Sequence, residues 1–181
     1  MTRYIALVGG PSTGKSSLIQ ALEKKGYPVL PEMARRVILE QRASGGKLLP
    51  SEDRDGFQQE VLRKQILQRQ ETYGKPLVFC DTSIACGIAY YLADQRAVPD
   101  AVWEAAREHW YDLVLFLDFP ATYEFDGLRI ETVEKARIIH AALKEVHQHL
   151  GHQIIVVPPV SVSERVAFVE QLIKEMIANE A

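Results

Sequence analysis

The segment from Gly9 to Ser16 limits the possible folds of this chain more than any other feature. It reads GGPSTGKS and matches the pattern G-x-x-x-x-G-K-[ST] in full. It also follows an apolar run at residues 5–8 and opens an amphipathic helix at residues 15–25, which is the context that a phosphate-binding loop needs. The alternative, a glycine-rich turn that binds nothing, does not account for this context. The segment therefore predicts a P-loop.

The chemistry of such a loop assigns a role to each residue type. Glycines let the backbone curl so that successive N–H groups point at phosphate oxygens, while the helix N-terminus adds partial positive charge. Lys15 is predicted to reach the β- and γ-phosphates of ATP or GTP, and the Ser16 hydroxyl to coordinate Mg²⁺. The guanine-reading string N-K-x-D is absent. The predicted nucleotide-binding residues are Gly9, Gly10, Pro11, Ser12, Thr13, Gly14, Lys15, Ser16 and Ser17.

Short apolar runs alternate with helix-prone segments along the chain. They lie at residues 5–8, 28–30, 77–80, 113–117 and 154–157. Because these runs are continuously apolar, they read as strands covered on both faces, as in the parallel sheets of α/β proteins. The sequence thus predicts an α/β fold in three layers around a five-stranded parallel sheet.

Length and composition favour one domain over residues 1–181. The formal net charge is −3 and the charged fraction is 25%, which gives no general attraction to nucleic acid or to an anionic membrane. The apolar runs are far shorter than the roughly 20 residues of a membrane helix. Cys80 and Cys86 lack CxxC spacing, and no leader precedes the first strand. A cytoplasmic location fits these features best.

Two insertions are expected to shape the site. Residues 33–76 are mostly helix-prone around a break that contains Gly45 and Gly46, which predicts helix, loop and helix as a cap over the C-terminal edge of the sheet. Residues 120–137 resemble a lid before a long helix at 132–150. The final helix is expected to begin at a capping box made by Ser161 and Glu164.

Acidic and basic residues follow the predicted strands. Asp81 ends the third strand, where its carboxylate would orient a magnesium-bound water or accept a proton from a substrate hydroxyl. A helix-capping role is the alternative. Glu32, Arg35 and Arg36 follow the second strand and are predicted to line the acceptor pocket. The alternative there is a solvated i,i+4 ion pair between Glu32 and Arg36.

Basic, histidine and aromatic side chains complete the candidates. Arg129, in the lid, is predicted to stabilise the transferring phosphoryl group, with Arg137 as a second choice. The spacing of four histidines does not suit a tetrahedral metal site, and a solvated helix surface is expected for them. Four aromatic residues are expected to pack in the core. These sets are His140, His147, His149 and His152, and Trp103, Trp110, Tyr90 and Tyr91.

Together these motifs resemble the P-loop small-molecule kinases, and most closely the AAA-type ATPase family that includes the nicotinamide-riboside kinase domain of NadR. The resemblance is carried by GGPSTGKSSL, YPVLPEMARRVI, VFCDTS, LFLDFPATYEFDGLR and SERVAFV. It implies strand order 2-3-1-4-5, ATP on the P-loop, and an acceptor between Glu32, Asp81 and the lid. Related kinases commonly have arginine where this chain has Thr82.

These features predict a phosphotransferase that moves the γ-phosphoryl group of ATP to a hydroxyl of a small, nucleoside-like metabolite. The predicted catalytic residues are Lys15, Asp81 and Arg129, and the predicted metal ligands are Ser16 and Asp81. The alternative is an ATPase or GTPase switch, or a nucleotide sensor, that acts through a protein partner.

Overall fold

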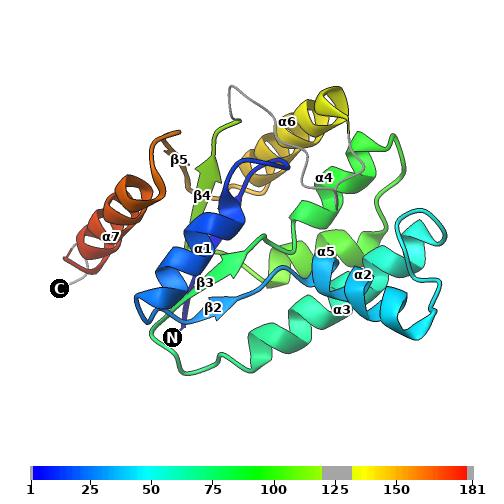
Figure 1. The fold of residues 1–181 in the computed structure, drawn as a ribbon, viewed down its shortest axis with the longest axis horizontal. Coiled ribbons are helices and arrows are strands. Elements are labelled where there is room, and N and C mark those ends of the chain that lie inside the picture. Colours follow the sequence, from blue (N-terminus) through cyan, green and yellow to red (C-terminus); the bar gives the residue numbers. More distant parts are fainter. Residues whose placement is uncertain (1, 120–131, 179–181) are drawn as a thin grey trace.

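The computed structural model describes residues 2–119 and 132–178 (Figure 1). Its strands are β1 (Arg3–Val8), β2 (Val29–Leu30), β3 (Leu77–Asp81), β4 (Leu113–Leu117) and β5 (Ile154–Val157). Its helices are α1 (Lys15–Lys24), α2 (Met33–Ser44), α3 (Arg54–Gln70), α4 (Cys86–Ala93), α5 (Asp100–Glu108), α6 (Val133–His149) and α7 (Val162–Ala178).

The five strands form one parallel sheet in the order β2-β3-β1-β4-β5. The central strand β1 pairs Ile5 with Phe79 of β3 on one side and with Leu113 of β4 on the other. This order confirms the prediction. Because all the strands are parallel, their C-terminal ends meet at one edge, where ligands bind in open α/β sheets.

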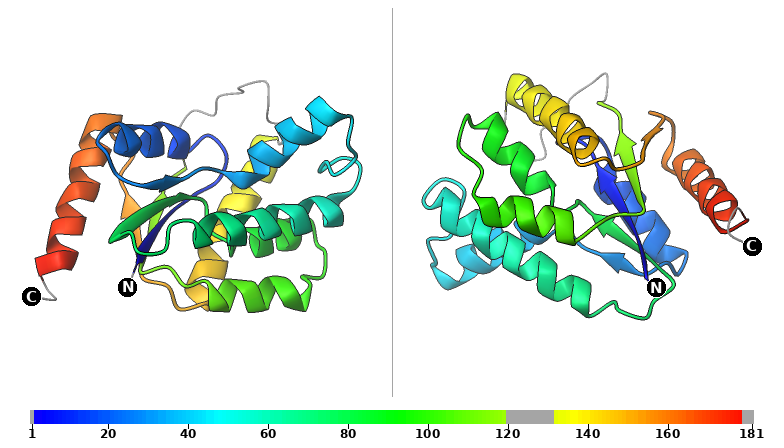
Figure 2. Two further views of the ribbon diagram at one scale, coloured as in Figure 1. Left: turned by 90° about the horizontal axis from the view of Figure 1, so that it is seen from below. Right: turned by 180° about the vertical axis from the view of Figure 1, so that it is seen from behind.

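Helices cover both faces of the sheet, which gives the predicted three layers (Figure 2). Helices α1 and α7 pack on one face, and α4, α5 and α6 lie on the other. Leu18 and Leu22 of α1 are fully buried against β1 and β3. Since burying a leucine contributes about 1.5–3 kcal/mol, these contacts fix the helix that carries Lys15.

The segment between β2 and β3 is helix, loop and helix, as predicted. Helices α2 and α3 pack on each other around a small apolar cluster of their own, which consists of Met33, Val37, Phe57 and Val61. Helix α3 begins at an N-cap, because the Asp53 carboxylate accepts a hydrogen bond from Gly56 N at 2.9 Å. The role of this segment as a cap stays a prediction.

Local sequence signals set the ends of α1 and α7. Gly26 follows α1 with φ of 92°, the left-handed conformation that glycine adopts without strain. Before α7, Glu164 N donates to Ser161 Oγ at 3.3 Å and Ser161 N donates to Glu164 Oε2 at 3.0 Å. This reciprocal pair confirms the predicted capping box.

The expectation of solvated histidines is wrong for His140, His147 and His152. His147 and His152 are 0% and 7% exposed, and the His140 side chain is 15% exposed. His147 lies on the face of α6 that packs against α4, and its Nδ1 lies 2.6 Å from Leu143 O. A carbonyl only accepts, so Nδ1 carries the proton and Nε2 accepts from the Ser83 hydroxyl at 2.7 Å. Burial lowers the pKa of His147 to about 4, so the buried ring is neutral.

The aromatic residues divide between core and surface. Tyr91 is buried, as expected, whereas the prediction of core packing is wrong for Trp110, which is 45% exposed. Trp110 instead stacks on His152 with 4.2 Å between the ring centroids.

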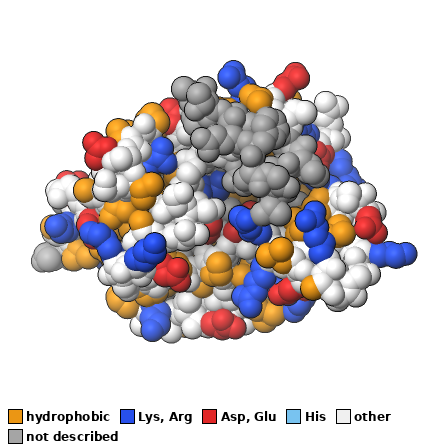
Figure 3. All heavy atoms as spheres, viewed as in Figure 1, with side chains coloured by type: hydrophobic (Ala, Val, Ile, Leu, Met, Phe, Trp, Pro, Cys, Tyr) orange, Lys and Arg blue, Asp and Glu red, His pale blue; other side chains and the backbone are white. Residues whose placement is uncertain are grey.

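Basic, acidic and apolar side chains are interspersed on the face shown in Figure 3. Within residues 2–119 and 132–178, no helix is both long and apolar enough to cross a membrane.

Candidate active site

The predicted P-loop connects β1 to α1 in a tightly closed conformation. Lys15 Nζ donates to Gly9 O at 2.8 Å and to Gly10 O at 2.9 Å. Thr13 Oγ1 also donates to Gly10 O, at 2.9 Å. Gly14, immediately before the helix, has φ of 85°. The lysine is therefore held across the start of the loop by main-chain carbonyls, and the loop curves around it.

Two glycines of the loop are required by close contacts. A Cβ atom on Gly9 would lie 2.7 Å from Leu117 O and 2.8 Å from Thr13 Oγ1. A Cβ on Gly10 would lie 2.9 Å from His140 Cβ and 3.2 Å from Ala136 O. Gly10 stands at a position that the motif leaves open, so packing against α6 explains why it is glycine.

Side chains from two distant helices contact the loop from outside. Arg165, near the start of α7, donates from Nη1 to Thr13 O at 2.9 Å. His140, on α6, accepts a hydrogen bond from Gly10 N at its Nδ1 atom, at 3.0 Å. Sequence reasoning missed both roles, because neither side chain is near the loop in the sequence. Arg165 lies within the SERVAFV motif, whose position alone gives it no function.

Asp81 lies at the C-terminal end of β3, as predicted, and is 7% exposed. Burial raises the pKa of Asp81 to about 6, and the negative charge of Glu32 adds to this rise. The positive charges of Lys15 and Arg35 act in the opposite direction. The structure therefore brings four of the predicted site residues within electrostatic range of one another.

The Asp81 carboxylate is also short of partners. Its Oδ1 atom is buried and has no hydrogen-bond partner among the residues that the structure describes. It does not cap α4, which starts at Cys86 after an Ala85 N-cap that has no side-chain bond. The helix-capping alternative is thus not what the structure shows. A buried carboxylate oxygen without a partner fits a proton acceptor or a cation ligand.

The backbone after Asp81 holds an uncommon conformation. Thr82 has φ of 80°, in the left-handed region that β-branched residues rarely adopt. Thr82 N donates to Leu7 O at 3.1 Å, and the next residue, Ser83, donates its hydroxyl to buried His147. The turn is therefore fixed on both sides, which sets the direction of the Asp81 side chain.

The predicted acceptor residues after β2 do not all point to the site. Glu32 is the N-cap residue of α2 and makes no capping hydrogen bond. Arg36 is directed to a solvated ion pair with Glu40, with 3.4 Å between Nε and Oε1. An i,i+4 pair thus exists, but with Glu40 and not with Glu32. Arg129 lies outside the described residues, and its role stays a prediction.

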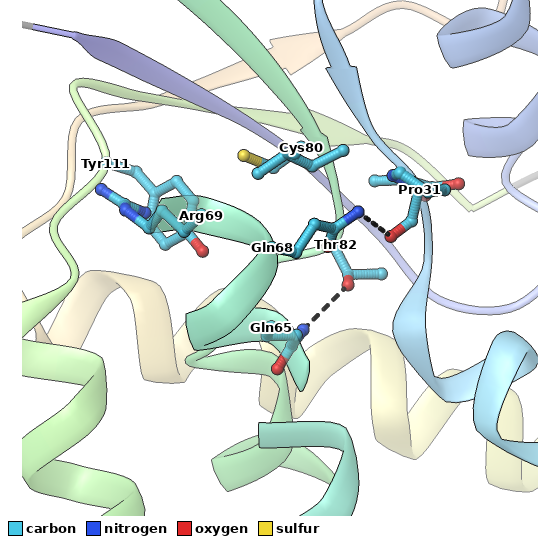
Figure 4. A pocket seen from close by; sticks show the side chains of 9 residues that line it. Pro31, Gln65, Gln68, Arg69, Cys80, Thr82 and Tyr111 are labelled. Carbon is cyan, nitrogen blue, oxygen red and sulfur yellow. Dashed lines mark hydrogen bonds between the residues drawn. The ribbon is translucent and has the colours of Figure 1, made fainter. Parts of the chain in front are cut away.

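A pocket opens beside Asp81, between α3 and the ends of β2 and β3 (Figure 4). Gln65 Nε2 donates to Thr82 Oγ1 at 3.5 Å, and Gln68 Nε2 donates to Pro31 O at 3.4 Å. Sequence reasoning missed these glutamines, since polar residues on a helix usually face solvent. The pocket is lined by Leu30, Pro31, Gln65, Gln68, Arg69, Cys80, Asp81, Thr82 and Tyr111.

Arg69 is buried beside this pocket. It is 7% exposed, and its guanidinium lies over the Tyr4 ring at 3.6 Å and the Tyr111 ring at 4.7 Å from the centroids. It also donates to Trp110 O. Such cation–π contacts stabilise a desolvated cation by about 2 kcal/mol. Arg69 therefore forms part of the pocket wall.

The residues at the edge of the sheet fit Mg²⁺ in ligand chemistry. Asp81 and Ser16 supply oxygen atoms, which Mg²⁺ prefers, and the free Asp81 Oδ1 offers a ligand. Among the described residues no group of three or more His, Cys, Asp or Glu could hold a metal. Mg²⁺ is commonly bound through one or two protein groups together with substrate phosphates.

Comparisons with known proteins agree with this geometry. A family model described as an AAA domain matches residues 4–165. The dephospho-CoA kinase of Helicobacter pylori is 28% identical over 149 residues, which cover 76% of this chain and 66% of that kinase.

Solved structures share the fold. A deoxyadenosine kinase from M. mycoides superposes with a TM-score of 0.68 and 15% identity, over 95% of this chain and 99% of that one. A NadR protein in complex with NR gives a TM-score of 0.66 and 18% identity, over 86% of this chain and 45% of that one.

Proposed function

Since this chain belongs to the AAA domain family, we propose that it is a P-loop kinase that transfers the γ-phosphoryl group of ATP to a hydroxyl of a small metabolite. One observation carries this proposal. Asp81, a buried carboxylate with a free oxygen, lines a pocket and is within electrostatic range of the P-loop lysine. A nucleotide switch that acts through a protein partner has no need of such a pocket.

Each group of residues at the site would have its own role in the reaction. The P-loop amides and Lys15 hold the triphosphate and stabilise the charge that develops on the γ-phosphoryl group. Asp81 accepts the proton of the acceptor hydroxyl, whose oxygen forms the new bond to phosphorus while the bond to the β–γ bridging oxygen breaks. ADP leaves with that oxygen. Mg²⁺, held by Ser16 and by Asp81 through a bound water, would neutralise phosphate charge and would leave the Asp81 carboxylate able to accept the proton.

The pKa of Asp81 suits this role. With a pKa of about 6, the carboxylate is mostly ionised at pH 7 and above, yet it is basic enough to take a proton during transfer. Turnover is therefore expected to fall as the pH falls through about 6, because the protonated acid cannot accept the hydroxyl proton.

The acceptor is proposed to be nucleoside-like. Relatives and neighbours named as kinases of dephospho-CoA and of deoxyadenosine support this class. The amides of Gln65 and Gln68 offer both donors and acceptors to a polar ring, and Glu32 offers an acceptor to sugar hydroxyls.

The free, buried thiols of Cys80 and Cys86 support action in the reducing cytoplasm.

The test is to incubate the purified protein with Mg²⁺ and ATP, and in parallel GTP, against a panel of nucleosides and sugar metabolites. ADP release and phosphorylated product are measured, with Lys15→Ala as the control. Turnover that depends on an acceptor, with a matching phosphorylated product, is the expected result. Turnover without any acceptor, or only when a protein is added, would support the switch instead.

A further inference from the structure

The peptide group between Gly9 and Gly10 is held from both ends. Its carbonyl, Gly9 O, accepts a hydrogen bond from Lys15 Nζ at 2.8 Å. Its amide, Gly10 N, donates to His140 Nδ1 at 3.0 Å. We propose that His140 is a positioning residue of the P-loop, which fixes this peptide and, through it, the lysine that binds the triphosphate.

The ring of His140 is confined to this orientation. Its centroid lies 4.6 Å from that of Phe116 and 5.4 Å from that of Phe119, and its side chain is 15% exposed. A Cβ atom added to Gly10 would lie 2.9 Å from His140 Cβ, so α6 packs closely against the loop at this point. The imidazole is thus a built contact between the helix after the predicted lid and the nucleotide loop.

The hydrogen bond fixes the tautomer of the ring. Because Nδ1 accepts, the proton of neutral His140 is on Nε2, which lies 3.9 Å from Asp118 Oδ1 just after β4. Burial lowers the pKa of His140, and the positive charges of Lys15 and Lys144 lower it further, whereas Asp118 opposes them. The ring is therefore neutral, and able to accept, at neutral pH.

The two hydrogen bonds act on one peptide dipole. An acceptor at the N–H end polarises the peptide group and makes its carbonyl a better acceptor for the ammonium group of Lys15. Protonation of His140 would remove that acceptor and place a second cation beside the lysine. Loss of His140 would leave Gly10 N, in a partly buried setting, without its partner. Both changes are expected to weaken triphosphate binding.

The inference rests on the proposed nucleotide site but not on any acceptor. It is tested by calorimetric titration of the full chain with ATP and Mg²⁺ in the absence of acceptor. His140→Leu removes the acceptor atom, and affinity should fall about tenfold. His140→Asn keeps an oxygen near the Nδ1 position, so affinity should stay within about threefold. In His140→Gln the polar atoms extend past that position, and affinity should resemble that of the leucine variant.

The pH dependence gives a second measurement. As the pH falls below the range in which imidazole ordinarily titrates, the unsubstituted chain should lose more affinity than His140→Asn, because the asparagine cannot be protonated. Titration of ATP and of Asp81 is common to both proteins and cancels in this comparison. The matched controls are His149→Leu and His149→Asn, exposed on the same helix, which should leave affinity unchanged.

Two outcomes would overturn the inference. These are normal affinity in His140→Leu, or equal weakness in His140→Asn and His140→Leu. If the leucine variant does not fold, as judged by circular dichroism, the contrast between asparagine and glutamine decides. Normal ATP binding without transfer to any acceptor would remove the kinase proposal alone, whereas no binding of ATP would remove both.

Discussion

The two halves of the candidate site are built in different ways. In the phosphate half, eight consecutive residues supply the loop. Lys15 donates to Gly9 O and Gly10 O within it, and His140 and Arg165 contact it from two distant helices. In the acceptor half, β2, β3 and α3 each contribute side chains. There Asp81 keeps an unpaired oxygen near the like charge of Glu32. The loop of the first half comes from one stretch of sequence, whereas the second half is assembled from separate elements and keeps a buried oxygen without a partner among the described residues.

This difference separates binding from chemistry. Because main-chain carbonyls hold Lys15 in the loop, little side-chain entropy of the lysine is lost when phosphate binds, which favours affinity. A buried carboxylate without a partner raises the free energy of the folded chain but is basic enough to accept a proton. Changes in the two halves should therefore have different effects on binding, turnover and stability.

The largest effect is expected for Lys15→Ala. It removes the ammonium group that the loop holds toward the phosphates, so turnover should fall by about 10²- to 10³-fold, and binding of ATP should weaken as well. Lys24→Ala, exposed at the last turn of the same helix, is the matched control and should change neither quantity. Steady-state kinetics and calorimetry measure the two effects. Unchanged ATP affinity in Lys15→Ala would contradict the account of the phosphate half.

Asp81→Asn is expected to lower turnover without a matching loss of ATP binding, which would distinguish the two halves of the site. Turnover should fall by about 10²-fold, the range for loss of a general base, while binding of ATP stays largely intact. Single-turnover measurement of product with saturating ATP tests this, with Asp100→Asn on the surface of α5 as the control. If turnover is unchanged, Asp81 has no part in catalysis.

The same variant should be more stable than the unsubstituted chain. A folded pKa of about 6, above the usual 3.8, means that the ionised carboxylate destabilises the fold above pH 6. The cost is about 1–3 kcal/mol, and it disappears as the pH falls through 6 toward 3.8. Urea unfolding of Asp81→Asn without ligands should therefore give a higher free energy of unfolding than the unsubstituted chain at pH 8, and this difference should be smaller at pH 5. A difference in unfolding free energy that does not change with pH would mean that the ionised Asp81 carboxylate does not destabilise the fold.

The smallest effect is expected for Gln68→Ala in the acceptor pocket. The KM for the acceptor should rise about fivefold, the cost of one lost hydrogen bond, whereas the KM for ATP should not change. Gln59→Ala, exposed on the same helix, is the control. An equal rise in both KM values would show that the pocket is not specific to the acceptor.

The two halves of the site also differ in how well the sequence predicts them. The loop, the strands and the capping box of α7 are local patterns, and each was correctly predicted, because their geometry depends on neighbouring residues. Strand order rested on a family resemblance and is confirmed. Gln65, Gln68 and His140 could not be predicted, because tertiary packing alone brings them to the site. His147 was wrongly expected at the surface, since its partner Ser83 is remote in the sequence.

Thr82 shows how the backbone can hold the Asp81 carboxylate, whose Oδ1 atom has no hydrogen-bond partner among the described residues. A threonine at φ of 80° costs about 1–3 kcal/mol of backbone strain, which a glycine would relieve. Yet glycine would also allow the turn many more conformations and would remove the hydroxyl that meets Gln65. The strained backbone at Thr82 thus restricts the orientation of the Asp81 carboxylate. A chain with glycine at this position would have less backbone strain, but its carboxylate would be held less firmly.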